Sequence, residues 1–105
     1  MPTRLGEKLR TLRKERGWTL DVLAAKASLS KSYLWELENR ESQRPSAEKL
    51  TALGDALGVS STFFLEEDSR VPEERHIDDA FFRGYQTLEP EAKEQLRKIL
   101  STFKK

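Results

Sequence analysis

Hydrophobic residues recur at helical spacing in the first part of the chain. Leu5, Leu9 and Leu12 lie four and three residues apart, which is the spacing of one face of an α-helix. Gly17 is a suitable C-terminal cap, since glycine readily adopts the left-handed conformation in which many helices end. The pattern predicts a first helix over residues 3–16.

Two short helices follow, separated by a brief turn. Thr19 can cap a helix over residues 19–27, and Ser30 can cap the next helix, over residues 31–39. A hydroxyl at such a position accepts a hydrogen bond from a free backbone amide. The turn between the two helices begins at Ser28. Two adjacent helices of about nine residues joined by a tight turn are the layout of a helix-turn-helix.

The helical pattern continues beyond a polar loop. Ser46 can cap a fourth helix that ends at Gly58, and a short fifth helix opening at Ser60 or Ser61 carries two phenylalanines. The sequence shows no strand pattern and no internal repeat. We therefore predict an all-α protein whose first domain, residues 1–67, is a five-helix helix-turn-helix domain.

The remaining residues divide into a connector and a helical extension. Residues 68–77 are mostly charged and offer little to bury, so we expect an extended connector in which His76 is exposed. Asp78 is expected to cap a further helix, and Pro90 occupies the favoured first position of the last one. The C-terminal helical segment is thus expected over residues 78–105.

This extension carries too much apolar surface for a free tail. Its large apolar residues are Phe81, Phe82, Tyr85, Leu96, Ile99, Leu100 and Phe103. Those in the last helix form one amphipathic stripe, and a single amphipathic helix is not stable alone. We expect these residues to make a homodimer. They could instead fold back on their own domain or bind another protein.

Composition limits the chemistry that the chain can perform. Its 105 residues contain no cysteine and one histidine, which excludes disulfides, thiolate metal sites and cysteine nucleophiles. A glycine-rich phosphate loop and a metal-ligand spacing are also missing. We therefore expect no enzyme, no metal and no cofactor. Since no apolar leader or membrane-length stretch is visible, we expect a cytoplasmic protein with no membrane partner.

The net charge of +1 conceals an uneven distribution. Residues 1–50 contain 11 Lys and Arg against 7 Asp and Glu, whereas residues 51–77 contain 2 against 6. A basic first half suits an anionic partner such as double-stranded DNA, although a solvated charged helix face would give the same count. The charge distribution is thus compatible with DNA binding, but it does not by itself indicate DNA binding.

The front of the third predicted helix carries side chains that can read DNA bases. In helix-turn-helix geometry the second short helix enters the major groove by its N-terminal end. The outward residues there are Lys31, Ser32, Trp35 and Glu36. Lysine can donate to guanine, serine can bond to either edge, and glutamate can accept from cytosine. Trp35 either touches a thymine methyl or a sugar, or covers the hydrophobic edge of the domain.

Four groups of residues follow one another along residues 5–65. They are Leu9…Leu12-Arg13…Gly17-Trp18-Thr19, Leu23-Ala24…Ala27…Leu29-Ser30, Leu34…Leu37-Glu38-Asn39 and Pro45-Ser46…Leu50…Leu53…Leu57-Gly58-Val59-Ser60. In this combination the chain resembles the helix-turn-helix domain of the Cro/CI-type phage repressors and their bacterial relatives. The resemblance implies sequence-specific DNA binding, with dimers reading two half-sites.

The resemblance also implies roles for individual positions. Lys31, Ser32 and Glu36 match the base-reading positions of the family. The positions matched to phosphate contact are Thr19, Ser30, Arg40, Gln43 and Arg44. Arg13 and Glu38 match a buried ion pair that ties the first helix to the third.

Three positions depart from the family's pattern. Leu20 stands where glutamine is frequent, so it is expected to pack rather than to contact phosphate. Ser28 stands where glycine is usual, and it can adopt a positive φ only at some cost. Arg40 stands where glycine is common after the third helix.

A further resemblance concerns the C-terminal segment. The stretch Ala80-Phe81-Phe82-Arg83-Gly84-Tyr85…Leu88…Pro90-Glu91-Ala92-Lys93 is similar to the tails of small repressors found beside zinc metallopeptidases. We predict a DNA-binding transcription regulator, a homodimeric repressor that inserts residues 31–39 in the major groove of a two-half-site operator. The alternative is an antitoxin-like or metallopeptidase-controlled regulator whose C-terminal helices bind a protein partner.

Overall fold

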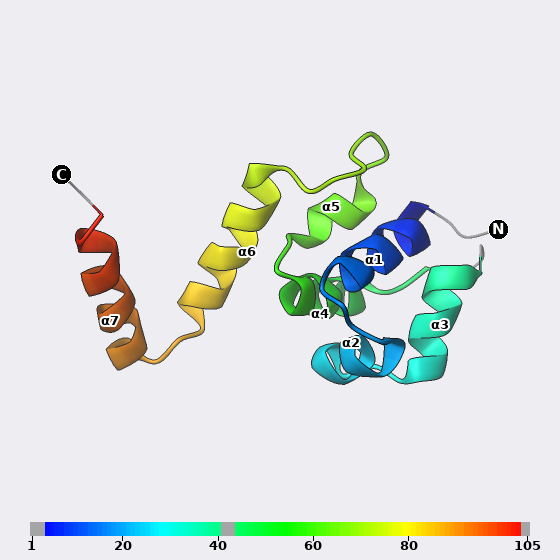
Figure 1. Cartoon of the computed structure of the whole chain (residues 1–105), viewed down its shortest axis with the longest axis horizontal. Helices are drawn as coiled ribbons and strands as arrows, with labels where there is room; N and C mark the ends of the chain where they lie inside the picture. Colours follow the sequence, from blue (N-terminus) through cyan, green and yellow to red (C-terminus); the bar gives the residue numbers. More distant parts are fainter. Residues whose placement is uncertain (1–3, 41–43, 104–105) are drawn as a thin grey trace.

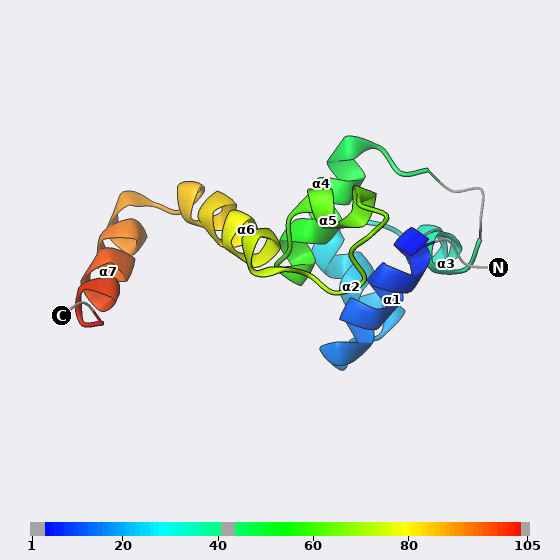
Figure 2. The same ribbon diagram turned by 90° about the horizontal axis from the view of Figure 1, so that it is seen from above.

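The computed structural model describes residues 4–40 and 44–103, and all regular elements in these ranges are helices (Figure 1). The elements are α1 (Arg4–Glu15), α2 (Leu20–Ala27), α3 (Lys31–Asn39), α4 (Ala47–Leu57), α5 (Ser61–Leu65), α6 (Glu74–Gln86) and α7 (Pro90–Ser101). The predicted all-α class, with a five-helix domain and a helical extension, is confirmed. The molecule is elongated, at 50 × 28 × 25 Å, and α3 and α7 lie at its opposite ends (Figure 2).

The first five helices enclose one hydrophobic core. Its buried members are Leu9, Leu12, Leu23, Ala24, Ala27, Leu34, Leu37, Leu50, Leu53, Leu57, Val59, Phe63 and Phe64. These are the periodic positions of the sequence, and burying each leucine stabilises the fold by roughly 1.5–3 kcal/mol. Helix α1 packs on α3 and α5, while α2 packs on α3 and α4. One face of α3 is thereby fixed from two sides, and the opposite face is left to solvent.

The backbones of α1 and α3 approach each other closely at Gly6. A Cβ atom at this position would lie 2.7 Å from the carbonyl oxygens of both Leu37 and Glu38. Glycine is therefore required there, because a methyl group would force the two helices apart. This contact sets how far α3 stands out from the body.

The turn between α2 and α3 has the geometry that a glycine would adopt easily. Ser28 has φ +57° and ψ +40°, and it is the one non-glycine residue with positive φ in the described ranges. Its backbone amide donates to the carbonyls of Ala24 and Ala25, which closes the end of α2. An L-residue in this conformation costs roughly 1–2 kcal/mol. The departure at Ser28 thus leaves the turn intact at an energetic cost.

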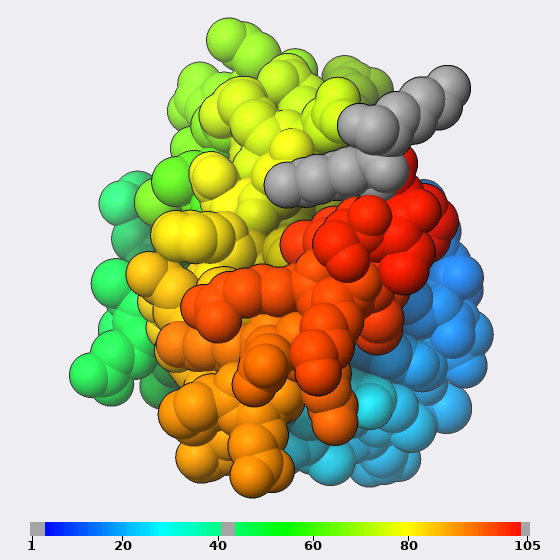
Figure 3. All heavy atoms as spheres, turned by 90° about the vertical axis from the view of Figure 1, so that its left-hand side faces the viewer, coloured from blue at the N-terminus to red at the C-terminus, as the bar shows by residue number. Residues whose placement is uncertain are grey.

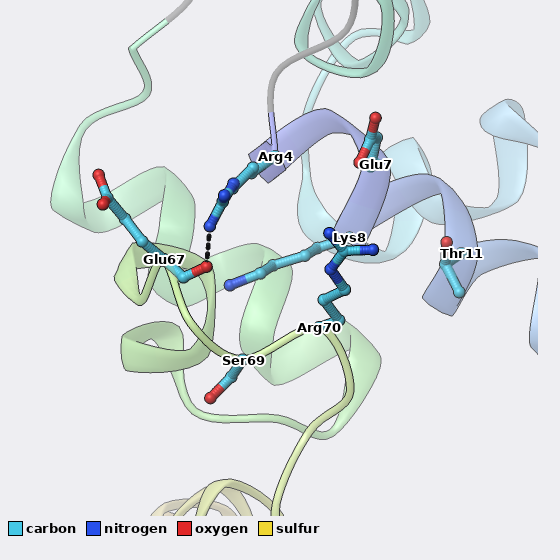
Figure 4. A pocket seen from close by; sticks show the side chains of 7 residues that line it. All are labelled: Arg4, Glu7, Lys8, Thr11, Glu67, Ser69 and Arg70. Atoms are coloured by element: carbon cyan, nitrogen blue, oxygen red, sulfur yellow. Dashed lines mark hydrogen bonds between the residues drawn. The ribbon is translucent and has the colours of Figure 1, made fainter.

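Helix α5 is joined to α1 by long basic side chains. The ammonium group of Lys8 donates to the carbonyl oxygens of Phe63 and Glu66 and lies 4.4 Å from the centre of the Phe63 ring. Arg4 donates to the carbonyl of Glu67 across a small cavity of about 160 Å³, as Figure 4 shows. Burial lowers the pKa of Lys8, and Glu66 opposes this shift. Lys8 therefore supplies the acceptor-rich end of α5 with a donor.

The prediction for His76 and for the start of the next helix is wrong. His76 is completely buried, with 0% of its surface exposed, and α6 begins at Glu74 rather than after Asp78. The backbone amide of Glu73 donates to Nδ1 of His76 at 2.8 Å, so the histidine caps its own helix. The composition of this charged stretch predicts little to bury, but its histidine ring packs against Phe63.

The two last helices leave most of their apolar side chains uncovered. Apart from His76, neither α6 nor α7 contains a buried residue. Lys93 and Arg97 of α7 lie over the ring of Tyr85 in α6, at 5.5 and 5.9 Å. Figure 3 looks onto this end of the molecule, where α7 in orange and red lies nearest the viewer, with α6 in yellow beside it.

Candidate DNA-binding surface

The N-terminal ends of α2 and α3 lie next to each other. Asp21 in the first turn of α2 and Lys31 at the start of α3 form an ion pair of 3.3 Å, and both side chains are mostly exposed. The free amides of a helix N-terminus, with the helix dipole, favour an anion such as a phosphate. Two such ends side by side form a surface that can lie along a nucleic-acid backbone.

The four base-reading candidates lie on the solvent side of α3. Lys31 and Ser32 are exposed, Trp35 is 44% exposed, and Glu36 is half-buried. The opposite face of the helix is buried through Leu34, Leu37 and Glu38. The structure thus brings the four side chains, which lie within six consecutive residues, onto one helix face, as groove reading requires.

Trp35 stands near the middle of this exposed face. Its ring lies 5.7 Å from the guanidinium of Arg40, and its carbonyl accepts from the side-chain amide of Asn39 at 2.8 Å. Trp35 belongs neither to the buried core nor to the partly buried residues packed against it. Both roles that the sequence leaves open for Trp35, contact with DNA and cover of the hydrophobic edge, stay predictions.

The phosphate candidates fall into three groups. The hydroxyls of Thr19 and Ser30 accept from the amides of Val22 at 3.2 Å and Tyr33 at 3.1 Å, so they cap α2 and α3. Each cap satisfies one of the free amides in the first turn of its helix and leaves others available for a ligand. Arg40 and Arg44 are exposed on the two sides of the loop after α3. Gln43 lies outside the described residues.

Sequence reasoning missed Lys49 beside this surface. Its ammonium lies 4.3 Å from the centre of the Tyr33 ring, which connects the first turn of α4 to α3. Its own amide is capped by the hydroxyl of Ser46 at 3.3 Å. The signal was available, since Lys49 follows a predicted cap by three residues and therefore lies in a first helical turn.

The structure brings Arg13 and Glu38 together as an ion pair at the back of α3. Arg13 Nε and Nη2 donate to the two carboxylate oxygens of Glu38 at 2.8 and 2.9 Å, and Nη1 donates to the carbonyl of Trp18. Both side chains are nearly inaccessible to solvent. The hydrogen bond to Glu38 raises the pKa of Arg13. The paired geometry holds α1, α3 and the turn before α2 in one arrangement.

Other kinds of site find little support in the part of the chain that the structure describes. No three His, Cys, Asp or Glu side chains in residues 4–40 and 44–103 lie close enough to hold a metal ion. Within the same ranges, no helix has the length and apolar character needed to cross a membrane.

Comparison with known proteins agrees with this geometry. A family model described as a helix-turn-helix domain matches residues 4–62. The immunity repressor of Bacillus phage phi105 is 38% identical over 71 residues, which are 68% of this chain and 49% of the repressor. The chain therefore spans about half the length of that relative. The transcriptional regulator SinR of Bacillus subtilis strain 168 is 32% identical over 74 residues, 70% of this chain and 67% of SinR.

A solved structure resembles the chain over nearly its whole length. This structure, of a complex of SinR with SinI, has a TM-score of 0.59 and 26% sequence identity, and the match covers 93% of this chain and 92% of that one. The similarity therefore extends beyond the five-helix body to α6 and α7. By its helix-turn-helix geometry and by these relatives, the chain belongs to the Cro/CI-type helix-turn-helix family of DNA-binding transcription regulators.

Proposed function

We propose that the chain is a homodimeric repressor that reads a two-half-site operator through α3. The observation that carries this proposal is the row of Lys31, Ser32, Trp35 and Glu36 on the solvent side of a helix whose other face is buried against α1 and α2. A rigid helix that presents donors, an acceptor and an aromatic ring can discriminate base pairs by their edges. A dimer bound over a promoter excludes polymerase. Such a protein acts on the chromosome, in the cytoplasm.

The phosphate contacts proposed for each protomer surround this row. The amides at the starts of α2 and α3, behind the Thr19 and Ser30 caps, suit two backbone positions. Arg40 and Arg44 supply charge after α3, and Gln43 is proposed for the same stretch from its position in the sequence. These contacts set the register of the protein on DNA, while the base contacts give specificity.

The proposed dimer forms through α6 and α7. Phe81, Phe82, Ile99 and Leu100 are more than half exposed, and Phe103 is 78% exposed. Tyr85 and Leu96, in the same two helices, are half-buried. Apolar side chains of this size gathered on two adjacent helices are typical of an interface rather than of a free surface. A second copy of the same chain would cover them and set two α3 helices on one DNA face.

A protein partner at α6 and α7 is the second candidate. It is favoured by one observation, namely that the similar solved structure is a complex of SinR with a second protein, SinI. Sedimentation of the purified chain distinguishes the two. A mass of twice 12.1 kDa at micromolar concentration supports self-association. A monomer would instead favour a hetero-partner such as the predicted metallopeptidase or toxin.

Binding to the DNA upstream of the chain's own gene tests the proposal. Lys31→Ala removes a proposed base contact and should weaken binding to the specific site by about 1–3 kcal/mol, or 5- to 150-fold. Lys98→Ala is the matched control, because Lys98 is an exposed lysine of α7 at the far end of the molecule. Equal effects of the two variants, or binding that does not weaken with salt, would overturn the proposal.

A further inference from the structure

His76 connects α6 to both ends of α5. Its backbone carbonyl accepts from the amide of Ser60, the N-cap of α5, at 2.9 Å. Its ring nitrogen Nε2 lies 2.5 Å from the carboxylate of Glu66, the C-cap of the same helix. The ring also packs on Phe63, at 5.2 Å between ring centres. His76, a fully buried residue of α6, therefore contacts α5 at its start, middle and end.

The protonation pattern of the ring follows from its partners. Nδ1 accepts from the backbone amide of Glu73, so the proton of a neutral imidazole lies on Nε2. Nε2 then donates to Glu66, whose carboxylate also accepts from Arg75 at 2.6 Å. Both ring nitrogens of His76 are satisfied, and no buried side-chain polar atom in the described ranges lacks a partner. Two fixed, directional bonds orient a ring more strictly than apolar packing alone.

The contacts of His76 belong to a series of polar contacts that connects α3, α1, α5 and α6. Glu38 of α3 binds Arg13 of α1, and Lys8 of α1 donates to two carbonyls of α5. Glu66, at the end of α5, then binds His76 of α6. Lys8 and His76 both lie against the Phe63 ring. The DNA-reading helix and the first helix of the extension are thus joined through buried or half-buried contacts.

Other contacts hold α6 less firmly. The ion pair between Arg83 and Asp55 of α4, at 3.0 Å, has side chains that are 59% and 50% exposed. Exposed pairs contribute little because water and salt screen them. Ile77, the next apolar residue of α6, is itself about half exposed. Arg75 of α6 also binds the carboxylate of Glu66, at 2.6 and 3.0 Å, but its side chain is 54% exposed. The direction in which α6 leaves the body therefore depends mainly on His76, whose side chain is fully buried.

We propose that His76 is a positioning residue that fixes the angle of α6 on the DNA-reading body, and thereby sets the operator half-site spacing that the dimer accepts. The second part of this proposal rests on the proposed function, that is, on dimerisation through α6 and α7. The first part concerns the single chain and can be tested without DNA.

The first experiment measures the angle of α6 directly. Because the chain has no cysteine, Lys14→Cys and Gln86→Cys place two unique spin labels on exposed positions of α1 and α6. With the labelled chain diluted in an excess of unlabelled chain, so that distances between protomers do not contribute, we expect one narrow distance distribution in the parent chain and a several-fold broader one with His76→Ala. His76→Gln keeps a donor that can reach Glu66 and should narrow the distribution again. An unchanged distribution in His76→Ala would overturn the proposal.

The second experiment measures the spacing that the dimer accepts. Operators whose half-sites are moved apart or together by one to three base pairs are compared for the parent chain, His76→Ala and the control Arg83→Ala. We expect a preference of 10-fold or more for one spacing in the parent chain and in Arg83→Ala, and a nearly flat profile in His76→Ala. Binding to a single half-site should be the same for all three.

The outcomes separate the two proposals. A broad distance distribution together with an unchanged spacing preference would show that His76 holds α6 but does not set spacing, which contradicts the second part. Failure of the parent chain to prefer any spacing, with a narrow distance distribution, would contradict the dimeric repressor while leaving the role of His76 on α6 supported. Loss of single half-site binding in His76→Ala would contradict the separation of reading and spacing.

Discussion

Arg13 and Glu38 are buried charges, and each compensates the charge of the other. Glu38→Ala would leave the Arg13 guanidinium without its carboxylate in a site that is nearly closed to solvent. Removal of one partner from a buried pair costs about 3–5 kcal/mol, because the desolvated charge that remains is uncompensated. We expect a loss of that size in the free energy of unfolding, measured by urea denaturation.

An exposed ion pair of the same chain provides the control. Glu94 and Lys98 lie 3.9 Å apart on the surface of α7, so Glu94→Ala should change the free energy of unfolding by less than about 1 kcal/mol. If Glu38→Ala shifted the urea midpoint no more than Glu94→Ala does, Arg13 and Glu38 would not brace α3 as described.

The stability of the contact between α6 and α5 should depend on pH through Glu66. The hydrogen bonds from Arg75 and then from His76 lower the pKa of Glu66 from 4.5 to about 2. Since the folded-state value is the lower one, the carboxylate favours the folded state fully above pH 4.5, and this contribution is lost as the pH falls toward 2. We expect the melting temperature to fall over that interval, with the amide of Glu73 losing its protection from hydrogen exchange.

Glu66→Gln tests the assignment of this pH dependence to one group. The amide cannot ionise, so the part of the fall that Glu66 causes between pH 4.5 and 2 should be missing in this variant. Glu74→Gln serves as the control, because Glu74 is an exposed acid at the start of α6 and should leave the parent profile in place. Identical profiles for Glu66→Gln and the parent chain would contradict the assignment.

At the scale of helices, two glycines of the chain should respond in opposite ways to the same substitution. Gly6→Ala puts a methyl group against the backbone of α3 and should destabilise the fold by about 1–3 kcal/mol. Gly84→Ala, in α6, meets nothing within 4 Å and should stabilise that helix by about 0.5–1 kcal/mol. Chemical denaturation of both variants measures the difference, and a similar effect of the two would contradict the close contact of α1 with α3.

The elements of the body could be predicted because their signals are local. Ser30, for example, has the hydroxyl, the position and the following helical periodicity that make an N-cap, and the structure contains that cap. The exposed positions of α3 follow from the same periodicity, since Leu34 and Leu37 mark its buried face. A helix pattern of this kind depends only on residues three or four apart.

The junction between body and extension could not be predicted in the same way. His76 lies among charged residues, and local composition indicates exposure there. Its burial depends on Phe63 and Glu66, which are ten or more residues away and must first be brought together by α5. The early start of α6 has the same cause, because the histidine that is buried also caps the helix at Glu73. Long-range packing decided both features.

At the scale of the whole molecule, the basic half of the chain and the helices proposed for dimerisation lie at different ends. The basic half of the chain contains α3, whereas α7 lies at the opposite end of a 50 Å molecule. The acidic stretch over residues 51–77 contains α5 and the start of α6, between the two ends. Under the proposed function, each protomer would therefore bring one set of basic contacts to DNA. Dimerisation through α6 and α7 would double the number of these contacts.

This doubling can be measured by the dependence of DNA binding on salt. The logarithm of the affinity falls with the logarithm of the salt concentration, with a slope of about −0.9 for each phosphate neutralised. Leu100→Glu places a charge in the apolar stripe of α7 and should give a monomer, whose slope on the operator should be about half that of the parent dimer. Gln95→Glu adds the same charge at an exposed position of α7 outside this stripe and should keep the parent slope. If Leu100→Glu sediments as a monomer but keeps the full slope, the phosphate contacts do not come from two protomers, and the dimeric arrangement on DNA is wrong.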